Sequence, residues 1–237
     1  MFGLFSSPAS LSEAAAATSH WVLGTPIAAD PQPGQAEALF GCGCFWGAEK
    51  GFWRLPGVIT TAVGYAGGRS DNPSYEQVCS GRSGHAEVVR VVWDLSVAGF
   101  ADLLRLFWEC HDPTQGDRQG NDRGSQYRSA LYLNDPELLA MAQASREAYQ
   151  EQLRRAGRGV ITTQIASGQR FFFAETYHQQ YLAKPGSRPY CSAQPSGVAL
   201  PDFPGSDRRL PEAVWQAYDW SIPHCILRGD NQPIRLS

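Results

Sequence analysis

The sequence has no long hydrophobic run and no excess of charge of either sign. None of its apolar stretches approaches the roughly 18 consecutive residues that a membrane-spanning helix needs. Twenty Lys and Arg residues stand against 23 Asp and Glu residues, which gives a net charge of -3. This balance provides no general attraction for nucleic acid. We therefore expect no membrane and no nucleic acid as partner, but a small molecule or a protein. We also expect a monomer.

Cysteine is scarce, and basic residues are missing from the first part of the chain. Six cysteines among 237 residues are too few for a secreted, disulfide-stapled scaffold. The first Lys or Arg is Lys50, so we expect neither the positive start of a signal peptide nor an Arg-rich transit peptide. The prediction is a protein of the reducing cytoplasm, where cysteines with a function act as thiolates or metal ligands.

Composition divides the chain into three parts. Residues 1–36 carry Ser, Ala, Pro and Gly with little periodicity, which predicts an N-terminal arm that is loosely structured or draped on the core. Residues 37–182 are predicted to form a single α+β domain that would hold any catalytic site. Residues 183–237 are rich in Pro, Gly and Ser and are predicted to be a C-terminal coil and tail. Its aromatic residues, such as Trp215 and Trp220, are too apolar to be left in water.

The hydrophobic pattern of residues 37–182 alternates between strand and helix periods. Long polar loops are expected at 66–84 and 112–126, and the last two strands are separated by a Ser-Gly-Gln turn as in a hairpin. The predicted fold is α+β, a two-layer sandwich of a mixed, mainly antiparallel sheet with helices, built on a ferredoxin-like plait with a long C-terminal coil. Strands are predicted at 38–43, 58–65, 85–93, 129–133, 160–166 and 170–174, and helices at 45–55, 100–111 and 136–156.

The segment GCGCFWGAEKGFW (41–53) places a cysteine where a strand and a turn lead into a helix. The sulfur of Cys44 would lie near the N–H groups of the first helical turn, where the helix dipole favours an anion, and this placement is expected to lower the pKa of the thiol. The alternative is a small buried hydrophobic residue. The neighbouring Phe45 and Trp46 favour the first interpretation, because a Trp on the first turn of a helix is either a core anchor or one wall of an apolar pocket.

A carboxyl group on an apolar face is the second informative feature. In the alternating strand 85–93, Glu87 points to the same side as Val89, Val91 and Trp93. A carboxyl group that is buried without a cation has a raised pKa and acts as an acid near neutral pH. The alternative is a solvated carboxylate at the end of the strand.

An ordered series of motifs then identifies a family. Starting with Gly43-Cys44-Phe45-Trp46-Gly47, the series covers about residues 37 to 191 and resembles peptide methionine sulfoxide reductase A. The five-residue motif alone is moderately specific, whereas the whole series in order is strongly specific. The motifs that follow are GYAGG, PSYEQVCSG, GHAEVVRVVWD, FWECHDPTQ, RQGNDRGSQYRSALY and YHQQYL.

This resemblance implies an enzyme that reduces the S-epimer of methionine sulfoxide, free or in proteins, without a cofactor, and so repairs oxidised proteins. The thiolate of Cys44 would attack the sulfoxide sulfur while Glu87 protonates the oxygen, which leaves methionine and a sulfenic acid. The family pattern further places Tyr75, Asp122 and Tyr127 around the sulfoxide oxygen. Taken alone, these three positions are typical of surface loops.

The resemblance also implies a substrate cage and a resolving thiol. Phe45 and Trp46 would hold the methyl group of the substrate by sulfur–aromatic contact. Cys191 matches the resolving cysteine, which would form a disulfide with Cys44 that thioredoxin then reduces. Such a disulfide requires the two Cα atoms to lie within about 7 Å, so a mobile segment is expected around KPGSRPYCSAQPSG (184–197).

The chain departs from the family pattern after Cys191, because no further cysteine follows closely. Cys225 could take the place of a third, recycling cysteine, or have no role. Cys42 is interpreted as a strand residue behind the nucleophile, with a small chance of diverting the sulfenic acid. Cys79 and Cys110 are interpreted as a loop and a core residue.

Three other classes of function stay open at this point. A zinc site would use Cys42, Cys44, His85 and His111, although a C-x-C spacing without a second compact pair is unfavourable for zinc. A cysteine hydrolase would pair Cys44 with His85 or His178 as a base. A binding module without catalysis would use the Phe45 and Trp46 patch as a contact surface.

Overall fold

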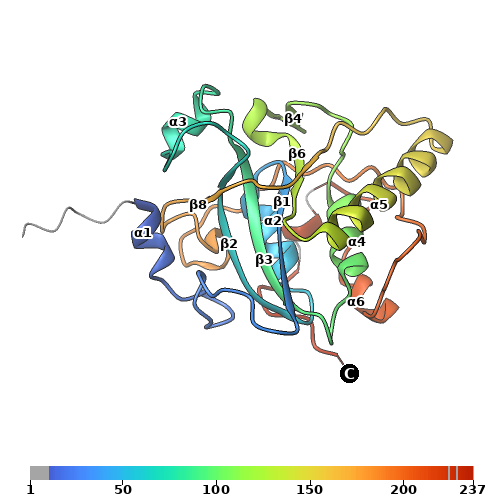
Figure 1. Cartoon of the computed structure of the whole chain (residues 1–237), viewed down its shortest axis with the longest axis horizontal. Coiled ribbons are helices and arrows are strands. Elements are labelled where there is room, and N and C mark those ends of the chain that lie inside the picture. Colours follow the sequence, from blue (N-terminus) through green and yellow to red (C-terminus); the bar gives the residue numbers. More distant parts are fainter. Residues whose placement is uncertain (1–10, 224, 228, 237) are drawn as a thin grey trace, which may run out of the picture.

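A mixed sheet of six strands runs through the centre of the molecule, in the order β7-β6-β1-β3-β2-β8 (Figure 1). The structure is a computed structural model and describes residues 11–223, 225–227 and 229–236. Only β6 and β7 pair in parallel, whereas the other neighbours pair antiparallel. The strands are β1 (Gln35–Cys42), β2 (Val58–Ala66), β3 (Ala86–Asp94), β6 (Ser129–Tyr132), β7 (Gln164–Ala166) and β8 (Phe171–Phe173), with β4 (Arg118–Gln119) and β5 (Asp122–Arg123) forming a separate small hairpin.

The helices gather mainly on one face of the sheet. Phe40 of β1 stacks on Phe52 of α2, with 4.4 Å between ring centroids, and contacts Phe107 of α4 at 5.8 Å. The side chain of Asp135 caps α5 by accepting from the first backbone N–H groups of that helix. The helices are α1 (Leu11–Ala16), α2 (Phe45–Trp53), α3 (Tyr75–Cys79), α4 (Phe100–Cys110), α5 (Pro136–Arg155) and α6 (Glu212–Trp215), with 3-10 turns η1 (Ser125–Tyr127), η2 (Tyr181–Ala183) and η3 (Cys225–Leu227).

The α+β class and the mixed, mainly antiparallel sheet are therefore confirmed. The four central strands and two helices follow one another along the chain as β1-α2-β2-β3-α4-β6. The ferredoxin-like plait stays a prediction.

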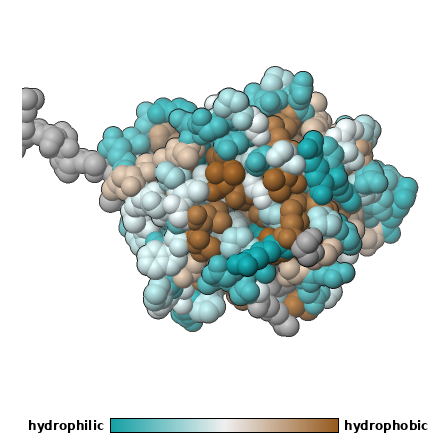
Figure 2. Space-filling view, turned by 90° about the horizontal axis from the view of Figure 1, so that it is seen from below, coloured by the Kyte–Doolittle hydropathy of each residue, from teal (hydrophilic) through white to brown (hydrophobic). Residues whose placement is uncertain are grey.

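Seen from below, apolar side chains form separate patches between polar ones (Figure 2). No helix in the described part of the chain is both long enough and apolar enough to cross a membrane.

The predicted hairpin of the last two strands is wrong. β7 pairs with β6 at one edge of the sheet and β8 pairs with β2 at the other edge. Four residues, 167–170, connect them and reach at most about 18 Å, whereas the edges of a flat six-stranded sheet lie about 24 Å apart. The sheet must therefore curl. Arg128, beside β6, indeed donates to the carbonyl of Gly67, beside β2, at 3.5 Å.

Two predicted loops contain short regular elements. The segment 66–84 holds α3, which begins with a capping box between Ser74 and Gln77. The segment 112–126 holds the β4–β5 hairpin and the start of η1. In Figure 1, α3 and β4 lie at the same upper end of the molecule. These elements are too short and too polar for hydrophobic periodicity to detect them.

Both ends of the described chain pack on the core. In the N-terminal arm, His20 Nε2 lies 2.9 Å from Thr61 Oγ1, and the carbonyl of Ile27 accepts from Arg90 at 3.0 Å. In the tail, Tyr218 donates to the carbonyl of Gly51 in α2 at 3.0 Å. The apolar tail residues predicted to avoid water thus join the main core.

Candidate active site

Residues from distant parts of the chain line one pocket of about 210 Å³. All seven of the residues predicted to surround the substrate contribute to it, and the structure adds one residue that the sequence analysis missed. The segments that meet here are the start of α2, α3, β3, the β5–η1 segment and the C-terminal coil. The lining residues are Cys44, Phe45, Trp46, Tyr75, Glu87, Asp122, Tyr127 and Tyr190.

Cys44 is the residue that precedes α2, as the strand–turn–helix pattern predicted. The turn before it requires Gly43, whose φ is 87°. The backbone N–H of Cys44 donates to Ser192 Oγ at 3.4 Å, and the side chain is 8% exposed. The thiol therefore lies at the bottom of the pocket rather than in the closed interior.

The expected lowering of the Cys44 pKa is wrong. Burial raises the pKa of this thiol well above its usual value, and the charge of Glu87 raises it further. The backbone N–H of Trp46 acts in the predicted direction and lowers the pKa, but its effect is smaller. The increase in the Cys44 pKa caused by desolvation is thus larger than the decrease caused by the N–H groups at the start of the helix. A thiolate at this position would need a nearby group to take the proton of the thiol.

Glu87 is the nearby titratable group, and it is buried as predicted. Its side chain is 2% exposed, and its Oε2 accepts from the backbone N–H of Phe45 at 3.1 Å. Burial raises the pKa of Glu87 to about 8, with a further increase from the charge of Asp122. The alternative of a solvated strand end is therefore wrong. At neutral pH the carboxyl group holds a proton, and it contacts the residue that follows Cys44.

Two tyrosines supply hydroxyl groups to the pocket. Tyr75 opens α3, and its backbone N–H donates to Glu175 Oε1 at 2.8 Å. Tyr127 lies in η1. Burial, followed in Tyr127 by the charge of Glu87, raises the pKa of both phenols, so both stay protonated donors. Asp122 accepts a short hydrogen bond from the hydroxyl group of Tyr190, which ties the C-terminal coil to the pocket.

A histidine contacts Phe45 and Trp46, the aromatic wall of the pocket, on the side away from the cavity. Trp46 stacks on Tyr181 with 4.0 Å between centroids and donates from Nε1 to His178 Nδ1 at 3.1 Å. The His178 ring also lies 5.2 Å from Phe45 and 4.7 Å from Tyr75. Burial lowers the pKa of His178 to about 4, so this ring is neutral. His178 therefore orients the wall and accepts a hydrogen bond from Trp46.

Glu175 is a further supporting residue that sequence reasoning missed. Its carboxylate accepts from the Tyr65 hydroxyl at 2.9 Å and from the backbone N–H of Tyr75 at 2.8 Å. It thus joins β2 to α3 beneath the pocket. Glu175 precedes the YHQQYL motif and Tyr190 precedes Cys191. Their position beside recognised motifs was the only feature of the sequence that could have indicated a role for Glu175 and Tyr190 in the site.

Cys191 packs directly against the first turns of α2. It is 4% exposed, and a Cβ added to Gly47 would lie 2.5 Å from its Sγ. The second glycine of the GCFWG motif is therefore required by the close approach of this sulfur. Burial raises the pKa of Cys191 to about 12. In this structure the segment predicted to be mobile contacts the pocket through Tyr190, Ser192 and Cys191 itself.

The residues of the rival sites do not converge on Cys44. His85 Nε2 lies 2.8 Å from the carbonyl of Ser70, outside the pocket. Cys42 and His111 cluster with Cys110 rather than with Cys44. Among the described residues no histidine hydrogen-bonds to the Cys44 thiol, because His178 Nδ1 faces Trp46. The side chain of Cys225, which was predicted as a possible recycling thiol, lies outside the described part of the structure.

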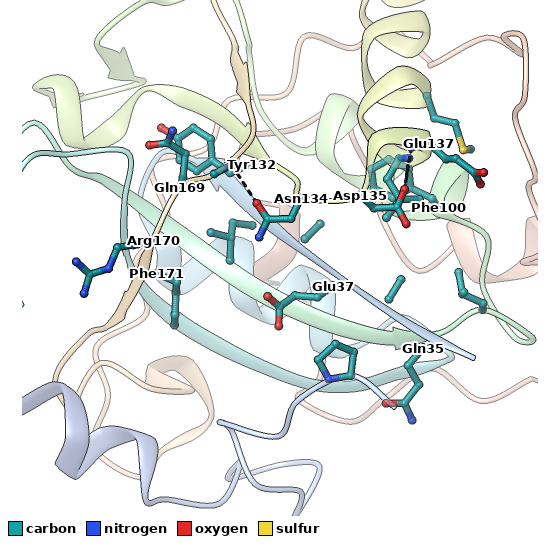
Figure 3. Close-up of a pocket in the computed structure, with 18 of the residues that line it drawn as sticks. Gln35, Glu37, Phe100, Tyr132, Asn134, Asp135, Glu137, Gln169, Arg170 and Phe171 are labelled. Atoms are coloured by element: carbon teal, nitrogen blue, oxygen red, sulfur yellow. Dashed lines mark hydrogen bonds between the residues drawn. The ribbon is translucent and has the colours of Figure 1, made fainter. Parts of the chain in front are cut away.

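A larger hollow of about 820 Å³ lies over β1 and the start of α5 (Figure 3). Its labelled side chains include Glu37 and Arg170, and Glu37 is paired with Arg90, whose Nε donates to it at 2.7 Å. Neither cysteine nor histidine is among the described residues that line this hollow. The described lining of this larger hollow therefore offers no thiol, unlike that of the smaller pocket around Cys44.

Comparisons with known proteins agree with this site. Over residues 36–199 the chain matches the family described as peptide methionine sulfoxide reductase. It is 58% identical over 188 residues to the peptide methionine sulfoxide reductase MsrA of Salinispora arenicola, which covers 78% of this chain and 84% of that protein. The corresponding protein of Azotobacter vinelandii is 56% identical over 184 residues, covering 77% of this chain and 84% of that protein.

A solved structure extends the agreement to the fold. Methionine sulfoxide reductase A of Corynebacterium diphtheriae superposes with a TM-score of 0.71 at 42% identity, covering 84% of this chain and 96% of that chain. The matched region includes the strand, the turn and the helix that carry Cys44. With most of its length matched in sequence and in structure, the chain belongs to the peptide methionine sulfoxide reductase A family, as its ordered motifs indicated.

Proposed function

We propose that this chain reduces the S-epimer of methionine sulfoxide, free or in proteins, to methionine, with Cys44 as nucleophile and Glu87 as acid. The observation that carries the proposal is the buried pair of a thiol and a protonated carboxyl group in one pocket, linked through the backbone of Phe45. The membership of the family supports the substrate class. No cofactor is needed for this reaction, because the thiol supplies both electrons.

The reaction balances with the groups at hand. The Glu87 carboxyl group gives its proton to the sulfoxide oxygen as the sulfur of Cys44 attacks the substrate sulfur, and the proton of the Cys44 thiol returns to the carboxylate. The sulfur–oxygen bond of the substrate breaks, methionine leaves, and Cys44 keeps the hydroxyl group as a sulfenic acid. Glu87 is thus unchanged at the end of the step, because the proton that it gives to the oxygen is replaced by the proton of the thiol.

The remaining pocket residues bind the substrate in this proposal. The hydroxyl groups of Tyr75 and Tyr127 remain protonated and donate to the oxygen as it gains charge. Phe45 and Trp46 surround the methyl group, where sulfur–aromatic contacts are favourable. Asp122 holds Tyr190 over the pocket and raises the pKa of Glu87 through its charge.

Cys191 resolves the sulfenic acid in the second half-reaction. Its thiol attacks the oxidised sulfur of Cys44, a Cys44–Cys191 disulfide forms, and water leaves with the proton of Cys191. Thioredoxin then reduces this disulfide by thiol exchange. The charge of Cys191 adds to the raised pKa of Cys44, which supports the proximity of the two sulfurs. The described cysteines, Cys44 and Cys191 included, are free in this structure.

Cys191→Ser tests the recycling step. The variant should release about one equivalent of methionine from reductant-free enzyme and then stall with thioredoxin, because no thiol resolves Cys44. Released methionine is measured per enzyme, with and without thioredoxin. Cys225→Ser serves as the matched control and should sustain turnover. Full thioredoxin-driven turnover by Cys191→Ser would transfer the resolving role to Cys225 or Cys42.

Gly47→Ala separates reduction from resolution. The new methyl group would displace the Cys191 sulfur, whereas alanine itself suits a helix better than glycine by up to about 1 kcal/mol. We expect methionine release in a single turnover to persist and disulfide formation to slow roughly tenfold, since a small misplacement of a reacting group is costly. Rapid quenching followed by mass analysis measures the disulfide. Gly51→Ala, where the nearest atom is the tip of Ile226 at 3.1 Å, is the control and should resolve normally.

The scarcity of cysteine in the sequence bears on the cellular setting. We propose a monomer in the reducing cytoplasm, where free cysteines persist. Residues 37–182 would carry the reductive chemistry, and residues 183–237 would deliver the resolving cysteine. The measurement is alkylation of free thiols in cytoplasmic extracts followed by gel electrophoresis. Separate gel bands for the enzyme with reduced and with oxidised Cys191 would show whether the enzyme cycles between the two forms in that compartment.

A further inference from the structure

Two cysteines outside the pocket meet behind the nucleophile. Cys42 ends β1 and Cys110 ends α4, two elements that lie far apart in the chain. Both side chains are 2% exposed. Their sulfurs, together with a ring nitrogen of His111, all lie within 4.8 Å of one another. The sequence analysis assigned one of these cysteines to the strand and the other to the core, so their contact is a product of the fold.

His111 is not free to join the two sulfurs in a metal site. One ring nitrogen, Nδ1, lies 2.7 Å from the carbonyl of Phe107, and the other, Nε2, lies 2.8 Å from Ser129 Oγ. A carbonyl only accepts, so Nδ1 carries the hydrogen and Nε2 accepts from the serine hydroxyl. Both nitrogens are used. This leaves two thiols within the described cluster, and two ligands are too few for a structural zinc site.

The thiol of Cys110 is hydrogen-bonded to its partner and stays protonated. A hydrogen bond with Cys42 and burial raise the pKa of Cys110 well above its usual value. Thiols that stay protonated and buried react slowly with dissolved oxidants.

The coil that carries Cys191 runs along the end of α4 where Cys110 lies. The backbone N–H of Gln194 donates to Gln119 Oε1 at 3.1 Å, and the same oxygen accepts from the backbone N–H of Asp112 at 3.2 Å. Further along, the N–H of Leu200 donates to Glu109 Oε1 at 2.9 Å. Consistent with this path, the charge of Cys110 raises the pKa of Cys191. Of the pair, Cys110 is therefore the cysteine whose helix end lies beside the coil that carries Cys191.

We propose that Cys42 and Cys110 form a second, internal dithiol that reduces the Cys44–Cys191 disulfide, an inference that rests on the proposed function. The sulfur of Cys110 attacks that of Cys191, the Cys44–Cys191 bond breaks, and Cys44 leaves with the proton of Cys110. The sulfur of Cys42 then attacks that of Cys110, and Cys191 leaves with the proton of Cys42. The product is a Cys42–Cys110 disulfide and a reduced pocket, with no external oxidant or reductant.

This internal dithiol stores one additional reducing equivalent in the enzyme. The first methionine sulfoxide oxidises Cys44 and Cys191, the internal dithiol restores them, and a second methionine sulfoxide oxidises them again. Reduced enzyme without any reductant should therefore release two methionines. A chain with only Cys44 and Cys191 would release one.

The test counts methionine released by the reduced, reductant-free full chain after mixing with excess S-sulfoxide. We expect two equivalents, and we expect peptide mass mapping to find the Cys42–Cys110 disulfide. Cys110→Ala should release one equivalent, and that first equivalent also shows that the variant is folded. Cys42→Ala should trap a Cys110–Cys191 disulfide. Cys225→Ala is the matched control and should still release two.

The results of this experiment distinguish a failure of the proposed function from a failure of the internal dithiol. No methionine from the unmodified chain would overturn the proposed function itself. A single equivalent from the unmodified chain would overturn the internal dithiol and leave the proposed function intact. The internal dithiol would also be overturned if Cys110→Ala released two equivalents of methionine, or if the unmodified chain released a second equivalent without forming a Cys42–Cys110 disulfide. Either result would assign the second equivalent to another thiol.

Discussion

Cys44→Ser should reduce the release of methionine from methionine sulfoxide by at least about 10³-fold, the scale seen when a covalent nucleophile is removed. The serine hydroxyl is too weakly acidic and too weakly nucleophilic to attack sulfur. The fold should persist, because serine is nearly the size of cysteine and the backbone N–H at this position still donates to Ser192. Single-turnover release with dithiothreitol, followed by chromatography, measures the effect.

The control for this variant is a change at another buried cysteine. Cys110→Ala does not alter the lining of the pocket and should keep the first equivalent of methionine. Thermal unfolding of Cys44→Ser should stay close to that of the unmodified chain. Methionine release by Cys44→Ser at more than a tenth of the normal rate would remove Cys44 from the chemistry and require another sulfur as the nucleophile.

Glu87→Gln should slow the reductive step by roughly 10²- to 10⁴-fold, the range for loss of a positioned acid. The glutamine amide keeps an oxygen that accepts from the Phe45 N–H, but it provides no acidic proton for the sulfoxide oxygen. Methionine release in a single turnover measures the change. A rate within threefold of normal would assign the proton to Tyr75 or Tyr127 instead.

The pH dependence gives an independent measure of the same group. Burial raises the pKa of Glu87 to about 8, so its carboxyl group is protonated below this pH and ionised above it. The single-turnover rate should therefore fall as the pH rises through about 8, and Glu87→Gln should lose this fall. Glu87→Asp retains an acid and should be slow but still dependent on pH. A flat profile for the unmodified chain would contradict the role of Glu87.

The residues that the sequence predicted best are those with a strong local pattern. Cys44 was located because a buried strand, a glycine turn and an apolar helix follow one another within a few residues. Glu87 was located because the alternation of β3 places it with Val89 and Val91. Tyr75 and Tyr127 lie in polar segments, and only the resemblance to a family connected them with the site.

Other features depended on contacts that no local pattern encodes. The β7 and β8 strands were predicted correctly as elements, but their partners depend on the curl of the whole sheet. The pKa of Cys44 was predicted in the wrong direction, because the helix start is visible in the sequence whereas the depth of burial is not. Tyr190 was missed because its bond to Asp122 spans 68 positions.

The sequence by itself determined the candidate nucleophile, the candidate acid, the helix and strands that carry them, and the family to which the chain belongs. Periodicity and turn chemistry act over a few residues, so the order of the amino acids is enough to reveal these features. Only the tertiary structure decided that Cys191 packs on Gly47, that Tyr190 covers the pocket and that Cys42 contacts Cys110. The reason is that desolvation and thiol contact depend on distances in space, which the packing of separate elements sets.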